Sequence, residues 1–274
     1  MNTIGASAAL SLLQSMNANS GSDDILSALY GGAQASGGNP IDALQQAERD
    51  QTKDVAAEAN DPSVKRDIDA FKTALSKAKD LPSLLADPTA RKVLLTANGL
   101  GDQTDYTALA TKALMSDPSD TKSLANQLSD QRWLTMAKTY NFAQNGLSTL
   151  KDPTVLSTLT NGYAEVMWRQ SLDQTTPGLS NALDFRSRAS TITSALQILG
   201  DSNLRSVVTT ALGIPEQIAF QSLDAQEKAI TDRVDISKFK DPTFVEQFTR
   251  RYLVAAGEAT NSSSQTSQSS GLLV

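Results

Sequence analysis

The stretch LPSLLADPTARKVLLTANGL, residues 81–100, decides the fold class. Its leucine-rich run breaks at Asp87-Pro88, restarts at once and stops at Gly99. Aspartate before proline is an efficient helix start, because the carboxylate accepts hydrogen bonds from free N–H groups and proline suits the first helical position. Glycine commonly ends a helix in a left-handed conformation. The stretch therefore predicts an approach segment ending at Leu85, a helix capped by Asp87, and a helix stop at Gly99.

The same start signal recurs along the chain. It is found at Asp61-Pro62, Asp117-Pro118, Asp152-Pro153 and Asp241-Pro242, and without proline at Asp42, Asp130 and Asp201. After the first of these, apolar residues follow at helical spacing, namely Val64, Ile68, Phe71 and Leu75. The nearest candidate for a strand, VVTTAL at 207–212, lies inside a helical pattern. We expect an all-α fold, a multihelical array of short Asp-capped helices.

Two parts of this array resemble each other. LLADPTARKVLLTANGLGDQ (84–103) aligns with ILGDSNLRSVVTTALGIPEQ (198–217). Further along, LSDQRWLTMAKTY (128–140) corresponds to FKDPTFVEQFTRRY (239–252). The pattern indicates an internal duplication, with two similar helical bundles at about 81–145 and 195–256 joined by two longer helices. The alternative is that capped amphipathic helices resemble one another in any protein.

Composition divides the chain into a body and two tails. Residues 1–40 are rich in Ser, Gly, Asn and Ala, which predicts a flexible N-terminal tail with at most a short helical piece from Ile4 to Met16. We expect a leading helix over residues 41–60 and the duplicated helical domain over residues 61–256. Residues 257–274 predict a second flexible, Ser-rich tail.

The overall composition excludes several classes of function. The 274 residues include no Cys and no His, which removes disulfides, serine triads, Cys/His dyads and the commonest metal ligands. A net charge of −6 argues against nucleic acid and anionic membranes as partners. No apolar run is long enough to cross a bilayer. The first basic residue is Arg49, so we expect no Sec signal peptide.

No sequence motif indicates an active site, a metal site or a cofactor-binding site. Asp232 with Asp235, or Glu216 with Asp224, could form an acid pair, but charge-mixed surroundings favour solvated side chains. DPSDTK at 117–122 is too sparse for a calcium loop and favours a double cap, with Ser119 or Asp120 starting the next helix. The glycine-containing segments lack the spacing of a phosphate loop. We therefore predict no catalytic residue, no metal ligand and no cofactor.

Aromatic and arginine residues invite two further interpretations. The aromatic side chains at helical spacing are expected in the core; they are Trp133, Trp168, Phe142, Tyr140 and Tyr163. Arg169, Arg186 and Arg188 flank Pro177-Gly178 and form the most distinctive polar group. Salt bridging is the simpler role for these arginines, and an interaction surface is the alternative.

Four stretches together resemble one protein family. They are LLADPTARKVLLTANGL (84–100), SDPSDTKSLANQLSDQRWLTMAKTYNF (116–142), TPGLSNALDFRSRASTITSALQILGD (176–201) and VDISKFKDPTFVEQFTRRYL (234–253). They are similar to the alphaproteobacterial domain-of-unknown-function family 1217 over about residues 61–256. Two positions depart from the family pattern: Ser180, where a basic residue is expected, and Arg186-Ser187, where an acidic-basic pair is expected. The resemblance implies an all-helical duplicated domain and a genomic home among flagellar genes. It carries over no catalytic residue.

The leading hypothesis is a non-enzymatic, flagellum-associated structural or assembly protein that acts through protein–protein contacts, with flagellar components as partners. Its acidic, Cys-free composition and the amphipathic start IGASAALSLLQSM (4–16) resemble those of exported flagellar proteins. One alternative is a cytoplasmic adaptor or assembly chaperone. Another is a carboxylate-dependent cell-wall hydrolase, which needs two carboxyl groups facing each other across a cleft. Location in the flagellum or the cytoplasm stays open, as does the oligomeric state.

Overall fold

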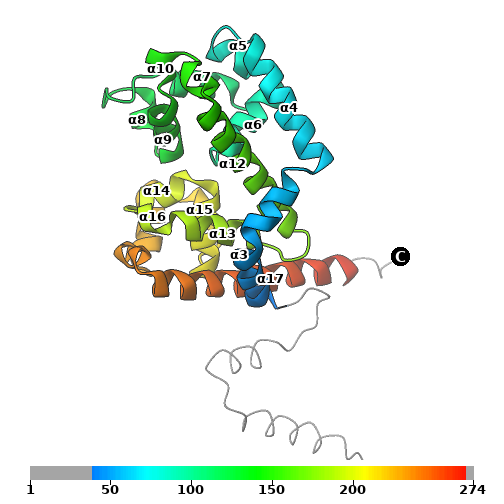
Figure 1. Ribbon diagram of the computed structural model, residues 1–274. Helices are drawn as coiled ribbons and strands as arrows, with labels where there is room; N and C mark the ends of the chain where they lie inside the picture. The colour runs from blue at the N-terminus through cyan, green and yellow to red at the C-terminus, as the bar shows by residue number, and fades with distance from the viewer. Residues whose placement is uncertain (1–38, 270–274) are drawn as a thin grey trace, which may run out of the picture. The chain divides into compact units, whose positions relative to one another are not determined.

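The computed structural model describes residues 39–269, with side chains as far as residue 259. Of the predicted N-terminal tail, residues 1–38 lie outside the described part, including the helical piece from Ile4 to Met16, whereas Pro40 already belongs to the first described helix. The last five residues of the chain also lie outside it. Within residues 39–269 all regular structure is helical and no strand occurs, which confirms the predicted all-α class (Figure 1).

The elements all belong to one compact unit. In chain order they are α3 (Pro40–Glu58), α4 (Pro62–Lys77), α5 (Leu81–Ala86), α6 (Pro88–Ala97), η1 (Gly101–Gln103), α7 (Thr107–Leu114), α8 (Leu124–Gln127), α9 (Gln131–Tyr140), α10 (Phe142–Asn145), α11 (Ser148–Lys151), α12 (Pro153–Leu172), α13 (Leu179–Arg188), η2 (Ala189–Thr191), α14 (Ala195–Gly200), α15 (Ser202–Ala211), η3 (Glu216–Phe220), α16 (Leu223–Thr231), η4 (Ile236–Lys240) and α17 (Pro242–Ser269).

Most of the predicted aspartate starts are confirmed. Asp87 accepts a hydrogen bond from Ala90 N at 2.8 Å and begins α6. Gly99 has a φ of +76° and ends the helix as predicted, with Leu100 N donating to Leu95 O at 2.8 Å. Asp61, Asp130, Asp152, Asp201 and Asp241 likewise precede helices and accept backbone N–H bonds. The predicted approach segment is itself a helix, α5.

Two predicted helix starts are wrong. At Asp117-Pro118 no helix begins, because the Asp117 carboxylate closes a local turn by accepting from Ser119 N at 2.8 Å. Asn126 Nδ2 then holds the carbonyl groups of Pro118 and Asp120, so the chain turns and α8 begins only at Leu124. The double cap that would start a helix at Ser119 or Asp120 is therefore wrong as well.

The second wrong start is Asp42, since α3 begins at Pro40 and Asp42 lies within its first turn. A carboxylate there still interacts favourably with the N-terminal end of the helix dipole. At the other end of the chain, α17 continues to Ser269, past the domain boundary predicted at 256/257. Residues 257–269 contain no proline, and Gly257 lies within the helix without a positive φ. Of the two long connecting helices predicted, α12 has 20 residues and α13 only 10.

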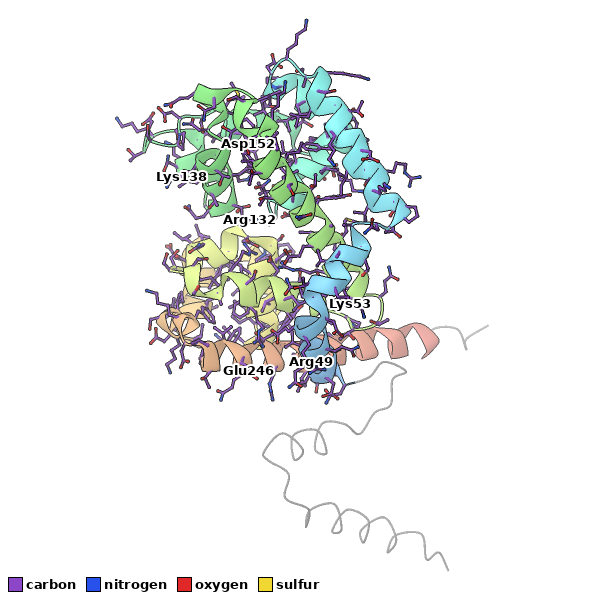
Figure 2. The ribbon with its side chains drawn as sticks, viewed as in Figure 1. Arg49, Lys53, Arg132, Lys138, Asp152 and Glu246 are labelled. Atoms are coloured by element: carbon purple, nitrogen blue, oxygen red, sulfur yellow. The ribbon has the colours of Figure 1, made fainter. Side chains whose placement is uncertain are left out.

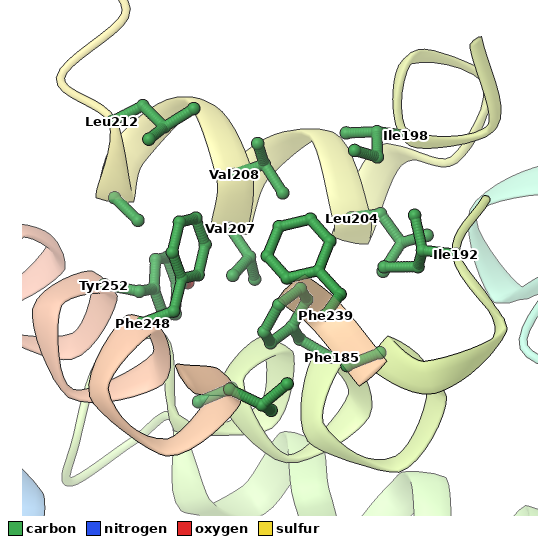
Figure 3. Close-up of a cluster of buried hydrophobic side chains, with 14 of the residues drawn as sticks. Phe185, Ile192, Ile198, Leu204, Val207, Val208, Leu212, Phe239, Phe248 and Tyr252 are labelled. Carbon is green, nitrogen blue, oxygen red and sulfur yellow. The ribbon is translucent and has the colours of Figure 1, made fainter. Parts of the chain in front are cut away.

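Buried apolar side chains form two clusters. The N-terminal core draws its members from Val64 to Ala164 and includes Trp133, Tyr140, Phe142 and Tyr163. The C-terminal core runs mainly from Trp168 to Leu253 and centres on three rings, Phe185, Phe239 and Phe248, with centroids 5.2–5.5 Å apart (Figure 3). All five aromatic residues predicted to be in the core are buried.

Two helices contribute to both cores. Along α12, Leu159 and Tyr163 enter the N-terminal core, whereas Trp168 enters the C-terminal core. Along α3, Leu44 packs in the C-terminal core and Val55 contacts both. The leading helix packs on α12, α13 and α17, and so is an integral part of the folded unit.

The two segments that align in sequence also match in local structure. The helix pairs α5–α6 and α14–α15 have equal lengths, and each longer helix is followed, two residues after its end, by a glycine with positive φ, Gly99 or Gly213. In each pair an arginine of the longer helix bonds back to a carbonyl of the shorter one: Arg91 to Leu85 O at 2.7 Å, and Arg205 to Leu199 O at 3.1 Å. Duplication accounts for this recurrence and stays a prediction.

Candidate functional site

The most buried charged group in the described chain is a network centred on Arg132 of α9. Its guanidinium group binds Asp130, with Nε 2.9 Å from Oδ1 and Nη2 2.8 Å from Oδ2. It also lies 3.1 Å from Asp102 Oδ1 and 3.2 Å from Asp201 Oδ2, and it donates to Gly99 O. Arg132, which is labelled in Figure 2, therefore joins three carboxylates, two from the first predicted copy and one from the second.

Local structure places each of these groups. Asp130 and Asp201 are the N-caps of α9 and α15, so each carboxylate is held by backbone N–H groups while it faces Arg132. Asp102 sits in η1, directly after the Gly99 stop of α6, and accepts from Ser202 Oγ at 2.8 Å. The helix caps predicted from sequence are thus also the ligands of a buried arginine.

Burial and charge act in opposite directions on this network. Desolvation of Arg132 disfavours its charged form, but the hydrogen bonds with Asp130 and the charges of Asp201, Asp130 and Asp102 outweigh it and raise its pKa. Burial also opposes ionisation of Asp102, yet hydrogen bonding from Gln103 and the nearby Arg132 charge lower the pKa of that carboxyl. Both groups therefore stay charged around neutral pH.

The network continues from Asp201 into the C-terminal half. Asp201 Oδ2 lies 2.6 Å from Arg188 Nη1, and Arg188 also binds Asp184. The remaining steps run from Asp184 to Arg169 at 3.5 Å, from Arg169 to Glu165, and from Glu165 to Gln51 of α3, whose Nε2 lies 2.9 Å away. Together, five carboxylates face three guanidinium groups in a continuous polar connection between elements of both cores.

A glycine allows the close approach that this network needs. Gly200 ends α14, and a Cβ atom built there would lie 2.7 Å from Ser129 C and 2.9 Å from Asp130 N. Both contacts are with backbone, which cannot move aside as a flexible side chain can. Gly200 thus lets the start of α15 sit directly against the start of α9. The aligned residue in the first copy is Ala86, which is exposed.

The three arginines singled out in the sequence all form ion pairs within the chain. Arg169 and Arg188 belong to the network, and Arg186 Nε lies 2.8 Å from Glu48 Oε1 of α3. The simpler interpretation, salt bridging, is therefore confirmed.

The carboxylates of the two candidate acid pairs, Asp232 with Asp235 and Glu216 with Asp224, either have other local partners or are exposed. Asp232 pairs with Lys228 at 3.0 Å, and Asp235 accepts from Ser237 N at 3.0 Å as the cap of η4. Glu216 and Asp224 are both exposed, at the start of η3 and in the first turn of α16. None of the four lines either of the two pockets described next.

Two pockets indent the described surface. One, of about 450 Å³, is lined by Asp54, Ala57, Glu58, Asn60, Asp61 and Trp168. The other, of about 250 Å³, is lined by Glu48, Gln51, Arg169, Leu183, Arg186 and Ser187. In the second pocket the ionisable groups are already paired, Arg186 with Glu48 and Arg169 with Glu165. Within residues 39–269 no group of acidic residues is arranged to hold a metal ion.

Sequence reasoning missed three features of the structure. Arg132 was not singled out, although it follows a predicted cap by two residues and precedes the core residue Trp133. The difference between Ala86 and Gly200 at aligned positions of the two predicted copies was also overlooked; it indicates a close backbone approach at Gly200. Extending the alignment by three residues would have paired Tyr106 with Phe220, two large aromatic residues that are both exposed.

Comparisons with known proteins agree with the helical architecture. The X-ray crystal structure of protein AGR_C_984 from Agrobacterium tumefaciens, a structural-genomics target, is similar with a TM-score of 0.65 and 25% sequence identity. The match covers 81% of this chain and 96% of that chain. A search of the curated proteins finds no match. Among the described helices, none combines the length and apolarity needed to cross a membrane.

The family resemblance seen in the sequence is confirmed over a narrower range than the 61–256 expected. The model of a family described as a protein of unknown function, DUF1217, matches residues 97–245. This range contains the central Arg132, all three of its carboxylate partners, and Gly200. Because the match spans more than half of the 274 residues, the chain belongs to the DUF1217 family.

Proposed function

We propose that the chain is a non-enzymatic, flagellum-associated structural or assembly protein that acts through contacts with other proteins. The observation that carries the non-enzymatic part is the use made of the three carboxylates around Arg132. Asp102, Asp130 and Asp201 all bind Arg132, and two of them also cap helices. A general acid or base must instead face a substrate.

The flagellar part of the proposal rests on the resemblance described above, which implies a genomic home among flagellar genes. The acidic composition without Cys is compatible with export through a flagellar channel. A helical unit that is stabilised by two hydrophobic cores and a polar network suits a protein that acts through contacts at its surface.

The test is fractionation in the bacterium that encodes the chain. The full-length protein should fractionate with flagellar structures. A chain lacking residues 1–38 should keep its helical circular dichroism and its melting behaviour but fail to reach that fraction. If the truncated chain still reaches the fraction, the first 38 residues do not carry the targeting signal, and a cytoplasmic adaptor becomes the better proposal. If neither form fractionates with flagella, the flagellar part is wrong.

A second test addresses catalysis. The purified protein should not turn over peptidoglycan or generic ester substrates. The non-enzymatic proposal fails if turnover is found and is abolished by Asp130→Asn or Glu216→Gln while circular dichroism is unchanged.

A further inference from the structure

One short segment exposes two large apolar side chains. Phe220, at the end of η3, is 89% exposed, and Leu223, at the start of α16, is 52% exposed. Exposed apolar residues that stand alone are normal on a protein surface. Here two of them lie three residues apart on one turn, and Phe220 is the most exposed large apolar side chain among the described residues.

The backbone beneath these side chains is held in place. Gln226 Nε2 donates to Gln221 O at 2.9 Å, which ties α16 back to the end of η3. Ser222 caps α16 by accepting from Ala225 N at 3.3 Å, and Ile218 packs against the C-terminal core. The backbone that carries Phe220 and Leu223 is therefore held by hydrogen bonds, which lowers the entropy cost of ordering it on binding.

The first predicted copy presents an aromatic residue at the aligned position. Tyr106 directly precedes α7, as Phe220 closely precedes α16, and it is 58% exposed. Its neighbour Leu109 is half-buried against the N-terminal core, so the apolar surface there is smaller. An aromatic side chain exposed at the same place in both segments is more than a single stray residue.

The charge around the Phe220 turn has one sign. Residues 215–227 include Glu216, Asp224 and Glu227 and no lysine or arginine. The next residue, Lys228, is directed to Asp232 at 3.0 Å. The segment thus combines two apolar anchors with three acidic residues and no basic one, a pattern that complements a basic, amphipathic ligand.

We propose that the Phe220 surface, formed by residues 215–227, docks a basic amphipathic helix of a partner protein. This deepens the proposed function, because it names the surface through which the chain makes its contacts. A second copy of the chain is a poorer occupant, since two acidic segments would meet. Residues 1–38 also fit poorly, because the first basic residue of the chain is Arg49.

The experiment measures fluorescence anisotropy of a labelled amphipathic leucine-lysine peptide added to the full-length protein. A peptide with glutamate in place of lysine is its control. The lysine peptide should bind, more weakly at higher salt, and the glutamate peptide should not. Phe220→Ser should weaken binding about tenfold, as expected for loss of an aromatic anchor. The control Met115→Ser, at a residue that is 42% exposed elsewhere, should leave affinity unchanged. Replacing Glu216 and Asp224 by lysine should also weaken binding.

Several outcomes would overturn the proposal. If the Phe220→Ser variant binds the peptide with the same affinity as the unsubstituted protein, the peptide is bound only through the net negative charge of the protein and not at the Phe220 surface. If sedimentation shows a dimer that Phe220→Ser abolishes, the occupant is a second copy. If removing residues 1–38 raises peptide affinity, the chain covers its own surface. If the peptide does not bind but the protein still fractionates with flagella, the proposal for the Phe220 surface is wrong and the proposed function is unaffected.

Discussion

Replacing Asp201 separates its role as a helix cap from its role in the ion-pair network. The side chain is 2% exposed, accepts from Asn203 N and Leu204 N, and contacts both Arg132 and Arg188. The chain offers a matched control in Asp87, which caps α6 at the aligned position but is exposed. Asp201→Ala and Asp87→Ala remove the same kind of cap from two very different surroundings.

The magnitudes follow from these contacts. Loss of a cap costs about 1 kcal/mol, which is the whole effect expected for Asp87→Ala. Breaking a buried ion pair costs about 3–5 kcal/mol. Arg132 keeps Asp130 and Asp102, and Arg188 keeps Asp184, so we take the ionic loss at Asp201 as about 2 kcal/mol. Asp201→Ala should therefore lower the free energy of unfolding by about 3 kcal/mol.

Urea unfolding followed by circular dichroism at neutral pH measures these differences. Asp201→Asn keeps an oxygen for the cap but loses the charge, so it should cost about 2 kcal/mol, whereas Asp87→Asn should be close to neutral. In thermal unfolding each kcal/mol corresponds to about 2–4 °C for a domain of this size. If Asp201→Ala costs no more than Asp87→Ala, the network adds nothing to stability and the reasoning fails.

Three further predictions concern the fold and its pH dependence. Gly200→Ala should lower the free energy of unfolding by about 1–3 kcal/mol, because its Cβ would press on the backbone of Ser129 and Asp130. The control Gly257→Ala in α17, with open space around it, should be neutral or stabilising. Equal effects of the two substitutions would contradict the close approach at Gly200. Burial and the Asp67 carboxylate raise the pKa of Tyr163 to about 12, so the stability linked to its neutral phenol is complete below about pH 10 and lost as the pH rises toward about 12. Tyr163→Phe should remove the latest step in the tyrosinate absorbance titration, and persistence of that step would assign it to another tyrosine. Although burial opposes the shift, hydrogen bonding from Gln103 and the charge of Arg132 lower the pKa of Asp102. Its contribution to the free energy of unfolding is therefore present above about pH 4 and is lost as the pH falls. Asp102→Asn should make the free energy of unfolding less dependent on pH in the acid range, and an unchanged dependence would argue against the pairing with Arg132.

The helices were predictable because their signals are local. Aspartate followed by proline caps the next turn through atoms within three residues, so Asp87 and Asp152 could be assigned without knowing any other part of the fold. The same reasoning failed at Asp117, where Asn126 stabilises a turn from outside the local window. It also missed the extent of α17, because Gly257, a residue type that often ends a helix, lies within this one without a positive φ.

The sequence by itself determined the all-helical class, most helix starts and the apolar faces, since these depend on periodicity and on bonds between near neighbours. Only the tertiary structure decided that Asp130 and Asp201, two similar caps far apart in the chain, share one buried arginine. It also decided that Phe220 stays exposed, whereas Phe185 and Phe239 are buried. The physical reason is that a cap is defined by its own helix, whereas an ion pair between distant residues and the exposure of a ring depend on how the helices pack.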